Sequence, residues 1–199
     1  MGEKYVMRNL VAELGSYGGG YSLVDLEETQ HLVYGKSMAS LSGPWPWSCV
    51  RDVPSRGGLG GCFRSTEGKW MGGFFGYRDD ACILHLELLG IHQGLTLAWE
   101  RGYRVVECQS DSLDAVNLIL SVPPSRHLYA SLIWDIKDLL SRTWMVKLHH
   151  TLREGNACAD FLAKHGASQN EALVLVEQPV AALGLLLLAD AAGVSFVRP

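Results

Sequence analysis

The chain has 199 residues, of which 48% are hydrophobic and 19% are charged, a balance typical of a globular protein that excludes a largely disordered one. The formal net charge is −4, so the chain lacks the overall basic surface by which many proteins attract nucleic acid. Contact with a polyanion would have to come from local basic residues or from metal ions that join acidic side chains to phosphates.

The cysteines are widely scattered, and none has the spacing of zinc ligands. This pattern predicts reduced core residues in an intracellular compartment, and it does not distinguish cytoplasm from nucleus. The five are Cys49, Cys62, Cys82, Cys108 and Cys158.

The first part of the chain gives the weakest structural signal. Residues 1–43 show little periodicity and include a glycine- and serine-rich stretch at 15–22, so we expect a divergent arm that is poorly ordered or loosely docked. Residues 44–47 (PWPW) should be extended, because a proline disfavours helix at the residue before it. We expect a domain over 44–168 and an apolar tail over 169–199.

The expected domain begins with two strands and continues with helices and strands in alternation. From Gly58, two strands are separated by a turn at Glu67 and Gly68. This order predicts an α/β fold in which helices flank a mixed sheet. The later elements are expected as helices over 81–101, 111–120, 127–142 and 156–164, and strands over 103–110 and 144–150.

The helix over 81–101 carries an acidic residue on an unusual face. Glu87 shares a stripe with Gly90 and Gly94, beside a stripe of larger apolar residues. Each glycine inside a helix costs about 1 kcal/mol relative to alanine. We therefore expect this face to lie against the sheet, with Glu87 at its edge.

Two further acids lie where other elements begin or end. Asp111 follows a strand, at the edge where open α/β sheets place their functional groups, and Asp160 lies one turn into the last helix. Three carboxylates that meet at one edge repel one another unless a cation neutralises them. Two Mg²⁺ ions held by such oxygen ligands hydrolyse phosphodiesters, and His150 at a nearby strand end could move a proton.

Each of these residues also has a purely structural interpretation. Asp111 could be a helix cap, Glu87 a solvated helix residue, and Asp160 a partner of the helix dipole. His149 and His150 alternate along a strand, so one of them could belong to the core. The residues alone leave both interpretations open.

Four segments together resemble a known family. GLGGCFRSTEGKWMGGFFG, HLELLGIHQGLTLAWERGY, VVECQSDSLDAV and HHTLREGNACADFLAKHG occur in the order found in the plant-type ribonuclease H-like domain. That domain occurs in retroelement-derived reverse transcriptases and in many stand-alone plant proteins. The resemblance implies a five-stranded mixed sheet flanked by helices, and Mg²⁺-dependent cleavage of the RNA strand of an RNA–DNA hybrid.

The resemblance also implies roles for individual residues. Glu87, Asp111 and Asp160 match the family's metal-binding carboxylates, and His150 matches its loop histidine. Asn156 matches the asparagine of the REGN motif. RNA–DNA hybrid and Mg²⁺ are accordingly the expected partner and cofactor, and no membrane partner is expected.

The chain departs from the family at its first strand. The family has an Asp-Gly-Ser or Asp-Gly-Ala signature there, whose aspartate is a principal metal ligand, whereas spacing places Trp47 near that position. Asp52 is the only acid between Glu28 and Glu67, and it could serve only if the connecting loop is shortened. Loss of a shared ligand would reduce turnover strongly.

Two other hypotheses follow from this departure. The domain could bind nucleic acid without cleaving it, through basic residues near the site: Arg51, Arg56, Arg64, Lys147 and Arg153.

The domain could instead be a protein-interaction module that docks a partner through its tail. In that tail, Val180–Ala189 is apolar but shorter than the roughly 20 residues that span a bilayer, so it predicts a buried C-terminal helix or a docking segment.

Overall fold

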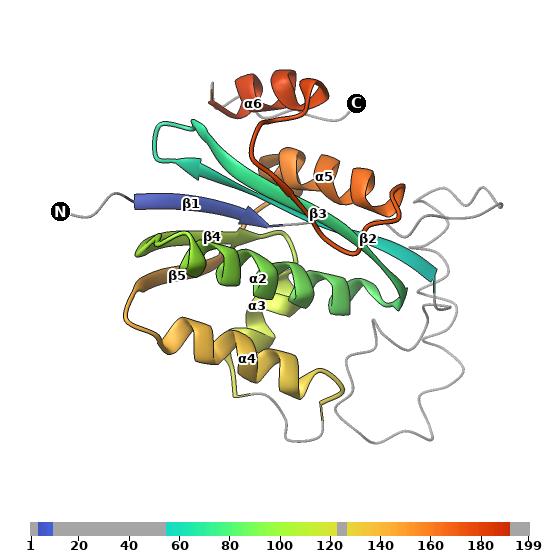
Figure 1. Cartoon of the computed structure of the whole chain (residues 1–199). Coiled ribbons are helices and arrows are strands. Elements are labelled where there is room, and N and C mark those ends of the chain that lie inside the picture. Colours follow the sequence, from blue (N-terminus) through green and yellow to red (C-terminus); the bar gives the residue numbers. More distant parts are fainter. Residues whose placement is uncertain (1–3, 10–54, 123–126, 192–199) are drawn as a thin grey trace.

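The computed structural model describes residues 4–9, 55–122 and 127–191, which form one sheet with helices on both faces (Figure 1). The sheet has six strands in the order β5-β4-β1-β2-β3-β6. The strands are β1 (Lys4–Asn9), β2 (Ser55–Ser65), β3 (Trp70–Ala81), β4 (Val105–Ser110), β5 (Met145–His150) and β6 (Val174–Val176). The helices are α2 (Ile83–Glu100), α3 (Leu113–Leu120), α4 (Ala130–Ser141), α5 (Ala157–Ala167) and α6 (Gly184–Ala191), with short 3-10 turns η2 (Arg153–Asn156) and η3 (Ala181–Leu183).

The expected α/β fold is confirmed, with one strand more than expected. β2 and β3 form the predicted antiparallel hairpin, which turns at Gly68 with a φ of 80°. β4 runs parallel to both β1 and β5, and Ser110 pairs in register with His150. The ends of β4 and β5 therefore lie side by side at one edge of the sheet.

β1 corrects the expectation of a loosely docked arm. Residues 4–9 lie inside the span 1–43, yet they form a strand between β4 and β2. Met7 is fully buried in the main core, and the ring of Tyr5 stacks on Tyr103 with 4.1 Å between centroids. A strand of six residues has too short a pattern to stand out beside the glycine-rich stretch. Residues 10–54, which include Trp47 and Asp52, lie outside the described residues.

The main core lies between the sheet and the helices α2, α3 and α4. The stripe predicted for α2 is buried as expected: Leu84, Leu88, Ile91, Leu95 and Ala98. Gly90 and Gly94 are buried as well. Their packing against other elements offsets the stability that two glycines cost inside a helix.

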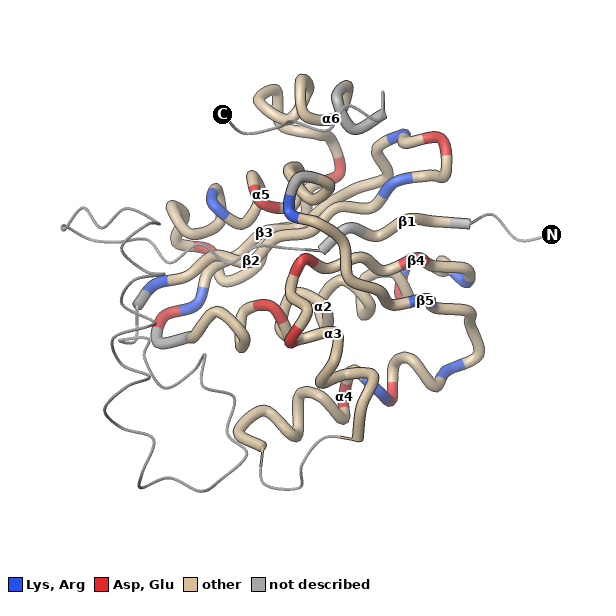
Figure 2. Tube along the Cα trace, turned by 180° about the vertical axis from the view of Figure 1, so that it is seen from behind, with Lys and Arg blue, Asp and Glu red and all other residues tan. Residues whose placement is uncertain are grey.

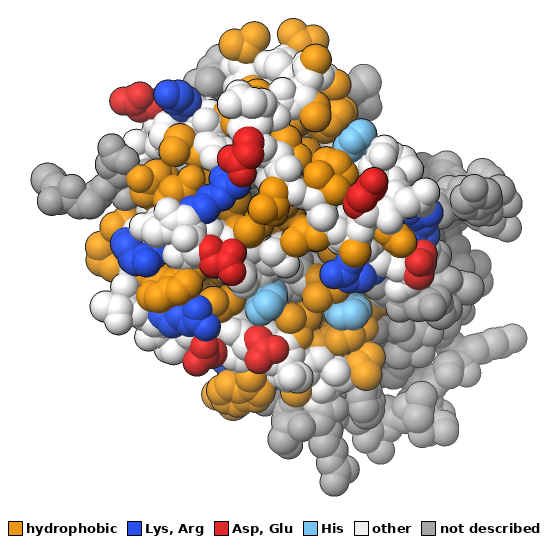
Figure 3. All heavy atoms as spheres, viewed as in Figure 1, with side chains coloured by type: hydrophobic (Ala, Val, Ile, Leu, Met, Phe, Trp, Pro, Cys, Tyr) orange, Lys and Arg blue, Asp and Glu red, His pale blue; other side chains and the backbone are white. Residues whose placement is uncertain are grey.

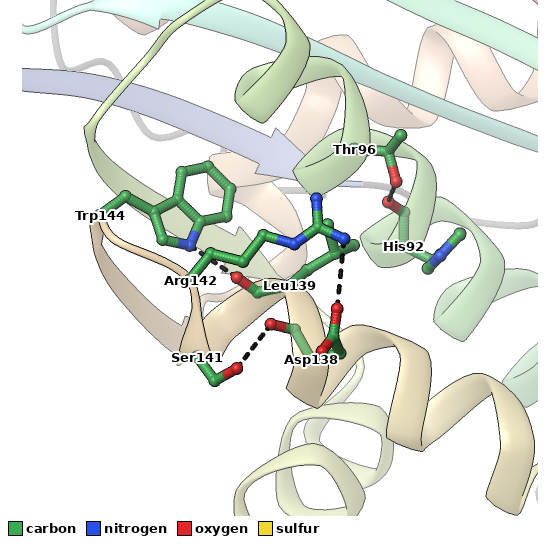
Figure 4. Close-up of polar contacts among 7 residues, drawn as sticks. All are labelled: His92, Thr96, Asp138, Leu139, Ser141, Arg142 and Trp144. Atoms are coloured by element: carbon green, nitrogen blue, oxygen red, sulfur yellow. Dashed lines mark hydrogen bonds and ion pairs between the residues drawn. The ribbon is translucent and has the colours of Figure 1, made fainter.

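The end of α4 is tied to the beginning of β5 by an aromatic and basic cluster (Figure 4). The indole Nε1 of Trp144 donates a 2.7 Å hydrogen bond to the carbonyl of Leu139, and Arg142 contacts Asp138 at 3.2 Å. The Arg142 guanidinium also lies over the ring of Trp99, 5.4 Å from its centroid. This cluster fixes the start of β5, at the opposite end of that strand from His150.

The second face of the sheet is covered by α5, which lies over β2 and β3 (Figure 1). Glycines in both layers allow this close approach. A Cβ atom added to Gly60 would lie 2.5 Å from the backbone nitrogen of Ala163. Since α5 begins beside the end of β4, this packing also determines where the polar residues at its start lie.

The described part of the tail adds a strand and a helix to the fold. β6 is the sixth strand and pairs antiparallel with β3, and Arg101 forms a 2.6 Å ion pair with Glu177 beyond it. Leu183 is fully buried in a second apolar cluster, together with Cys158 and Leu162 of α5. Leu185 and Leu188 of α6 are 81% and 68% exposed, in a region where Figure 3 shows hydrophobic side chains at the surface. Within the described part of the chain, no helix combines the length and apolar character needed to cross a membrane.

Candidate functional site at the ends of β4 and β5

Asp111 follows β4 directly and is not the cap of the next helix. Ser112 takes that role, because its hydroxyl accepts a 3.2 Å hydrogen bond from the backbone N–H of Ala115. The Asp111 carboxylate instead accepts a 3.0 Å hydrogen bond from the side-chain amide of Asn156. The capping interpretation of Asp111 is therefore wrong, and its carboxylate faces the start of α5.

Asn156 is fully buried where η2 leads into α5. It stands at the N-cap position of α5, but its side chain makes no capping hydrogen bond. Its amide reaches across to Asp111 and so joins the end of β4 to the start of α5. This was not foreseen, because the two residues lie 45 positions apart.

Burial raises the pKa of the Asp111 carboxyl, and the nearby negative charge of Asp160 acts in the same direction. The hydrogen bond from Asn156 and the positive charge of Arg153 lower this pKa, and burial is the larger influence. Asp111 and Asp160 thus act on each other electrostatically, as expected for acids brought to one edge of a sheet.

Asp160 lies in the first turn of α5 and is held by two cations. Its Oδ1 accepts a 3.2 Å hydrogen bond from Arg153, and its Oδ2 lies 2.8 Å from the Nζ of Lys164. The Asp160 side chain is only 15% exposed, whereas both cationic side chains are 40% exposed. Sequence reasoning missed Lys164, although its spacing of four residues from Asp160 is typical of an ion pair on a helix.

Glu87 is buried at 4% exposure, so the interpretation of this residue as solvated is wrong. The described residues nevertheless contain no group of three or more His, Cys, Asp and Glu side chains that could hold one metal ion. The structure brings Asp111 and Asp160 together, and it does not complete a metal-binding group by adding Glu87.

The histidines and basic residues near the site differ in their exposure. His150 ends β5 and is exposed, while His149 is half-buried, 3.4 Å from Glu107 across the strands. Neither histidine belongs to the buried core. Arg64 is only 3% exposed and donates to the Cys158 sulfur at 2.8 Å, so it cannot contact phosphates as expected.

The other three basic residues named for such contacts differ in their surroundings. Lys147 is exposed, and Arg56 is occupied by the carbonyl of Gln169 and the ring of Tyr77. Arg51 lies outside the described residues. Figure 2 shows basic and acidic residues interspersed along the described chain, which agrees with binding through local cations rather than one basic face.

Among the residues that the structure describes, the side chains at this edge do not fit a pair of Mg²⁺ ions. Oxygen ligands are the right kind, but both oxygens of Asp160 are occupied by cationic side chains. β1 lies where a first strand would contribute a ligand beside Asp111, and its residues, KYVMRN, include no acid. Asn9 pairs in register with Ser110, immediately before Asp111.

Comparison with known proteins places these residues in a family. The sequence profile of the reverse transcriptase-like family matches residues 48–166, more than half of the chain and a span that contains Glu87, Asp111 and Asp160. The chain belongs to this family. Its ribonuclease H-like domain is of the plant retroelement type, as the sequence motifs predicted.

One curated relative is a candidate ribonuclease H protein of Arabidopsis thaliana, 31% identical over 118 residues. The match covers 59% of this chain and 19% of the relative, so the chain spans about a fifth of the length of the protein it matches.

Solved structures share the fold at low sequence identity. The N-terminal ribonuclease H domain of a Mycobacterium tuberculosis protein has a TM-score of 0.57 at 17% identity, covering 83% of this chain and 94% of that one. Ribonuclease H1 of Halobacterium salinarum has a TM-score of 0.57 at 14% identity, with 82% and 96% covered. The ribonuclease H1 called LC11, solved in complex with an RNA/DNA hybrid, has a TM-score of 0.53 at 16% identity, with 82% and 96% covered.

Proposed function

We propose that this chain binds RNA–DNA hybrids at the edge formed by the ends of β4 and β5 and the start of α5. The observation that carries the proposal is that the family match runs through Asp111, Asn156 and Asp160, the residues that meet at this edge. A ribonuclease H1 with the same fold was solved in complex with an RNA/DNA hybrid, which supports this class of ligand.

Binding would depend on a few local cations, because the chain is acidic overall. Arg153 and Lys164 flank Asp160 and remain 40% exposed, and Lys147 is exposed on β5. Each phosphate contact releases a counterion, so the affinity should fall steeply as salt is raised.

The proposal is tested by fluorescence anisotropy of a labelled RNA–DNA hybrid in EDTA, at low and at physiological salt. We expect Arg153→Gln and Lys147→Gln each to weaken binding and to reduce the salt slope by about 1. Lys69→Gln is the matched control, because Lys69 is exposed in the β2–β3 turn. Binding that is insensitive to salt, or equal weakening by the control, would contradict the proposal.

Mg²⁺-dependent cleavage of the RNA strand, with Glu87, Asp111, Asp160 and the outlying Asp52 as ligands and His150 assisting, stays a prediction. The two cations on Asp160 favour the alternative, binding without cleavage. A gel assay with labelled hybrid and Mg²⁺ separates the two. Cleavage by the wild type but not by Asp111→Asn would support catalysis, whereas equal cleavage by both, or by neither, would remove it.

A further inference from the structure

A face away from the candidate site combines accessible aromatic rings with charges of both signs. It is formed by α4 and the C-terminal end of α2, around the cluster drawn in Figure 4. Three of the six tryptophans of the chain lie here: Trp99, Trp134 and Trp144. Trp134 is 56% exposed, and the other two are half-buried. These three residues and the charged residues around them are called the tryptophan face below.

The three rings belong to one surface. Along α4 and its C-cap, Trp134, Asp138 and Arg142 follow one another at a spacing of four residues, which places them on one side of the helix. Arg142 contacts Asp138 at 3.2 Å, and its guanidinium lies 5.4 Å from the centroid of the Trp99 ring. Trp144 stands edge-on to Trp99, with 5.3 Å between the ring centroids.

The charged residues of the tryptophan face balance one another. Its basic residues are Arg104, Lys137 and Arg142, and its acidic residues are Glu100, Asp135 and Asp138. Arg104 is exposed, and its guanidinium lies over Trp99, 4.2 Å from the ring centroid. Figure 3 shows hydrophobic, basic and acidic side chains interspersed where α2 and α4 end, at the left of the view. Three positive and three negative charges leave this face neutral, although the whole chain is acidic.

We propose that the tryptophan face is the contact surface between two copies of this chain, which associate weakly and reversibly about a two-fold axis. A two-fold contact brings the same patch of both subunits together, so each charge must find its opposite within the patch itself. Equal numbers of basic and acidic residues meet this condition. The proposal does not require hybrid binding, and the two can fail separately.

The residue types favour a protein partner over nucleic acid. Tryptophan and arginine are enriched at the energetic centres of protein interfaces, and a tryptophan ring supplies a large contact area at low cost in conformational entropy. A nucleic acid would meet three acidic side chains on this face, and these repel a polyanion. The exposed pair of Arg142 and Asp138 contributes little by itself, so both side chains can pair with a second copy instead.

Contact through this face leaves the candidate site uncovered. The tryptophan face lies at the start of β5, whereas His150 ends that strand and pairs in register with Ser110, next to Asp111. Self-association and hybrid binding are therefore expected at opposite ends of β5, and they can be measured independently.

Sedimentation velocity of the full chain, without nucleic acid, tests the proposal. The wild type should show a sedimentation coefficient that rises with protein concentration toward that of a dimer. Trp134→Ser removes an exposed ring and should weaken self-association by at least about tenfold. Leu185→Ser is the matched control, because it removes an apolar side chain that is 81% exposed on α6, and it should associate like the wild type.

Charge reversal tests whether the face is complementary to itself. Arg104→Glu and Glu100→Arg each give the face an excess of one sign, so each alone should weaken self-association. An equal mixture of these two variants should associate more tightly than either one, because their excess charges are opposite. Glu67→Arg makes the same change of charge as Glu100→Arg in the exposed β2–β3 turn, and it should behave like the wild type.

Two results would overturn the proposal: a wild type that stays monomeric at every concentration, or self-association that the variants of the tryptophan face leave unchanged. If Trp134→Ser does not fold, the wild-type series and the mixture of charge-reversed variants still decide. A monomeric wild type whose hybrid affinity falls in Arg104→Glu would assign the face to nucleic acid instead. Either failure leaves the hybrid-binding edge untouched, because that edge is tested with variants of its own.

Discussion

At the scale of single residues, Asp111 links the site to stability. Burial raises the pKa of this carboxyl in the folded chain, so the folded state holds its proton more tightly than the unfolded state. Its contribution to stability is therefore greatest at low pH and is lost as pH rises from the unfolded pKa through the higher folded pKa. We expect Asp111→Asn to raise Tm near neutral pH and to flatten this part of the pH dependence.

Thermal unfolding of the two proteins across the acidic to neutral range measures the effect. The asparagine oxygen can still accept the hydrogen bond from Asn156, so little contact is lost. Asp114→Asn is a suitable control, because Asp114 is exposed on α3. A lower Tm for Asp111→Asn at neutral pH would show that the carboxylate stabilises the fold.

Sequence reasoning predicted that Asp111 follows a strand and that Asp160 lies in the first turn of a helix, and the structure confirms these two positions. Strand ends and helix starts can be recognised from local patterns. It could not foresee the hydrogen bond from Asn156 to Asp111, since the chain between them gives no local signal of the contact. The sequence indicates only one of the two cations that contact the Asp160 carboxylate. Lys164 has helical spacing from it, whereas Arg153 reaches it from the preceding turn.

At the scale of elements, the packing of α5 on β2 positions the site. We expect Gly60→Ala to destabilise the protein by about 1–3 kcal/mol, because the added Cβ would meet the backbone of Ala163. Relief of that overlap would move α5 and with it Asn156 and Asp160, so hybrid affinity should fall as well. Urea unfolding measures the first effect and anisotropy the second.

Gly184→Ala is the matched control for this prediction. Gly184 begins α6, and a Cβ atom there would have no neighbour within 4 Å among the described residues. Its replacement by alanine should be neutral or slightly stabilising. Unchanged stability of Gly60→Ala would show that α5 can move away at little cost.

The elements also show where pattern reasoning fails. The hairpin β2–β3 and the helix α2 were predicted because a turn glycine and a long apolar stripe are strong local signals. β1 was missed, because a strand of six residues gains its stability from pairing with β2 and β4 on both sides. Such non-local pairing leaves little trace in the sequence of the strand itself.

At the scale of the whole molecule, the tail determines whether strand β3 is paired on its outer side. The sequence left open whether residues 169–199 dock on their own domain or on a partner. In the structure Val176 pairs with Gly73 of β3, and Leu183 is fully buried in an apolar cluster with residues of α5. Among the described residues of the tail, Leu185 and Leu188 are the most exposed large apolar side chains, so they are the first candidates for contact with a partner.

We expect a chain ending at Asn170 to lose most of its stability. Burial of an apolar side chain the size of Val176 or Leu183 contributes about 1.5–3 kcal/mol, and removal of β6 also exposes the pairing edge of β3. Circular dichroism should show a lower Tm, and size-exclusion chromatography should show aggregates.

Leu185→Ser with Leu188→Ser, which changes only exposed side chains, should leave Tm nearly unchanged. A truncated chain that stays folded and monomeric would show that the tail serves a partner surface and not its own core.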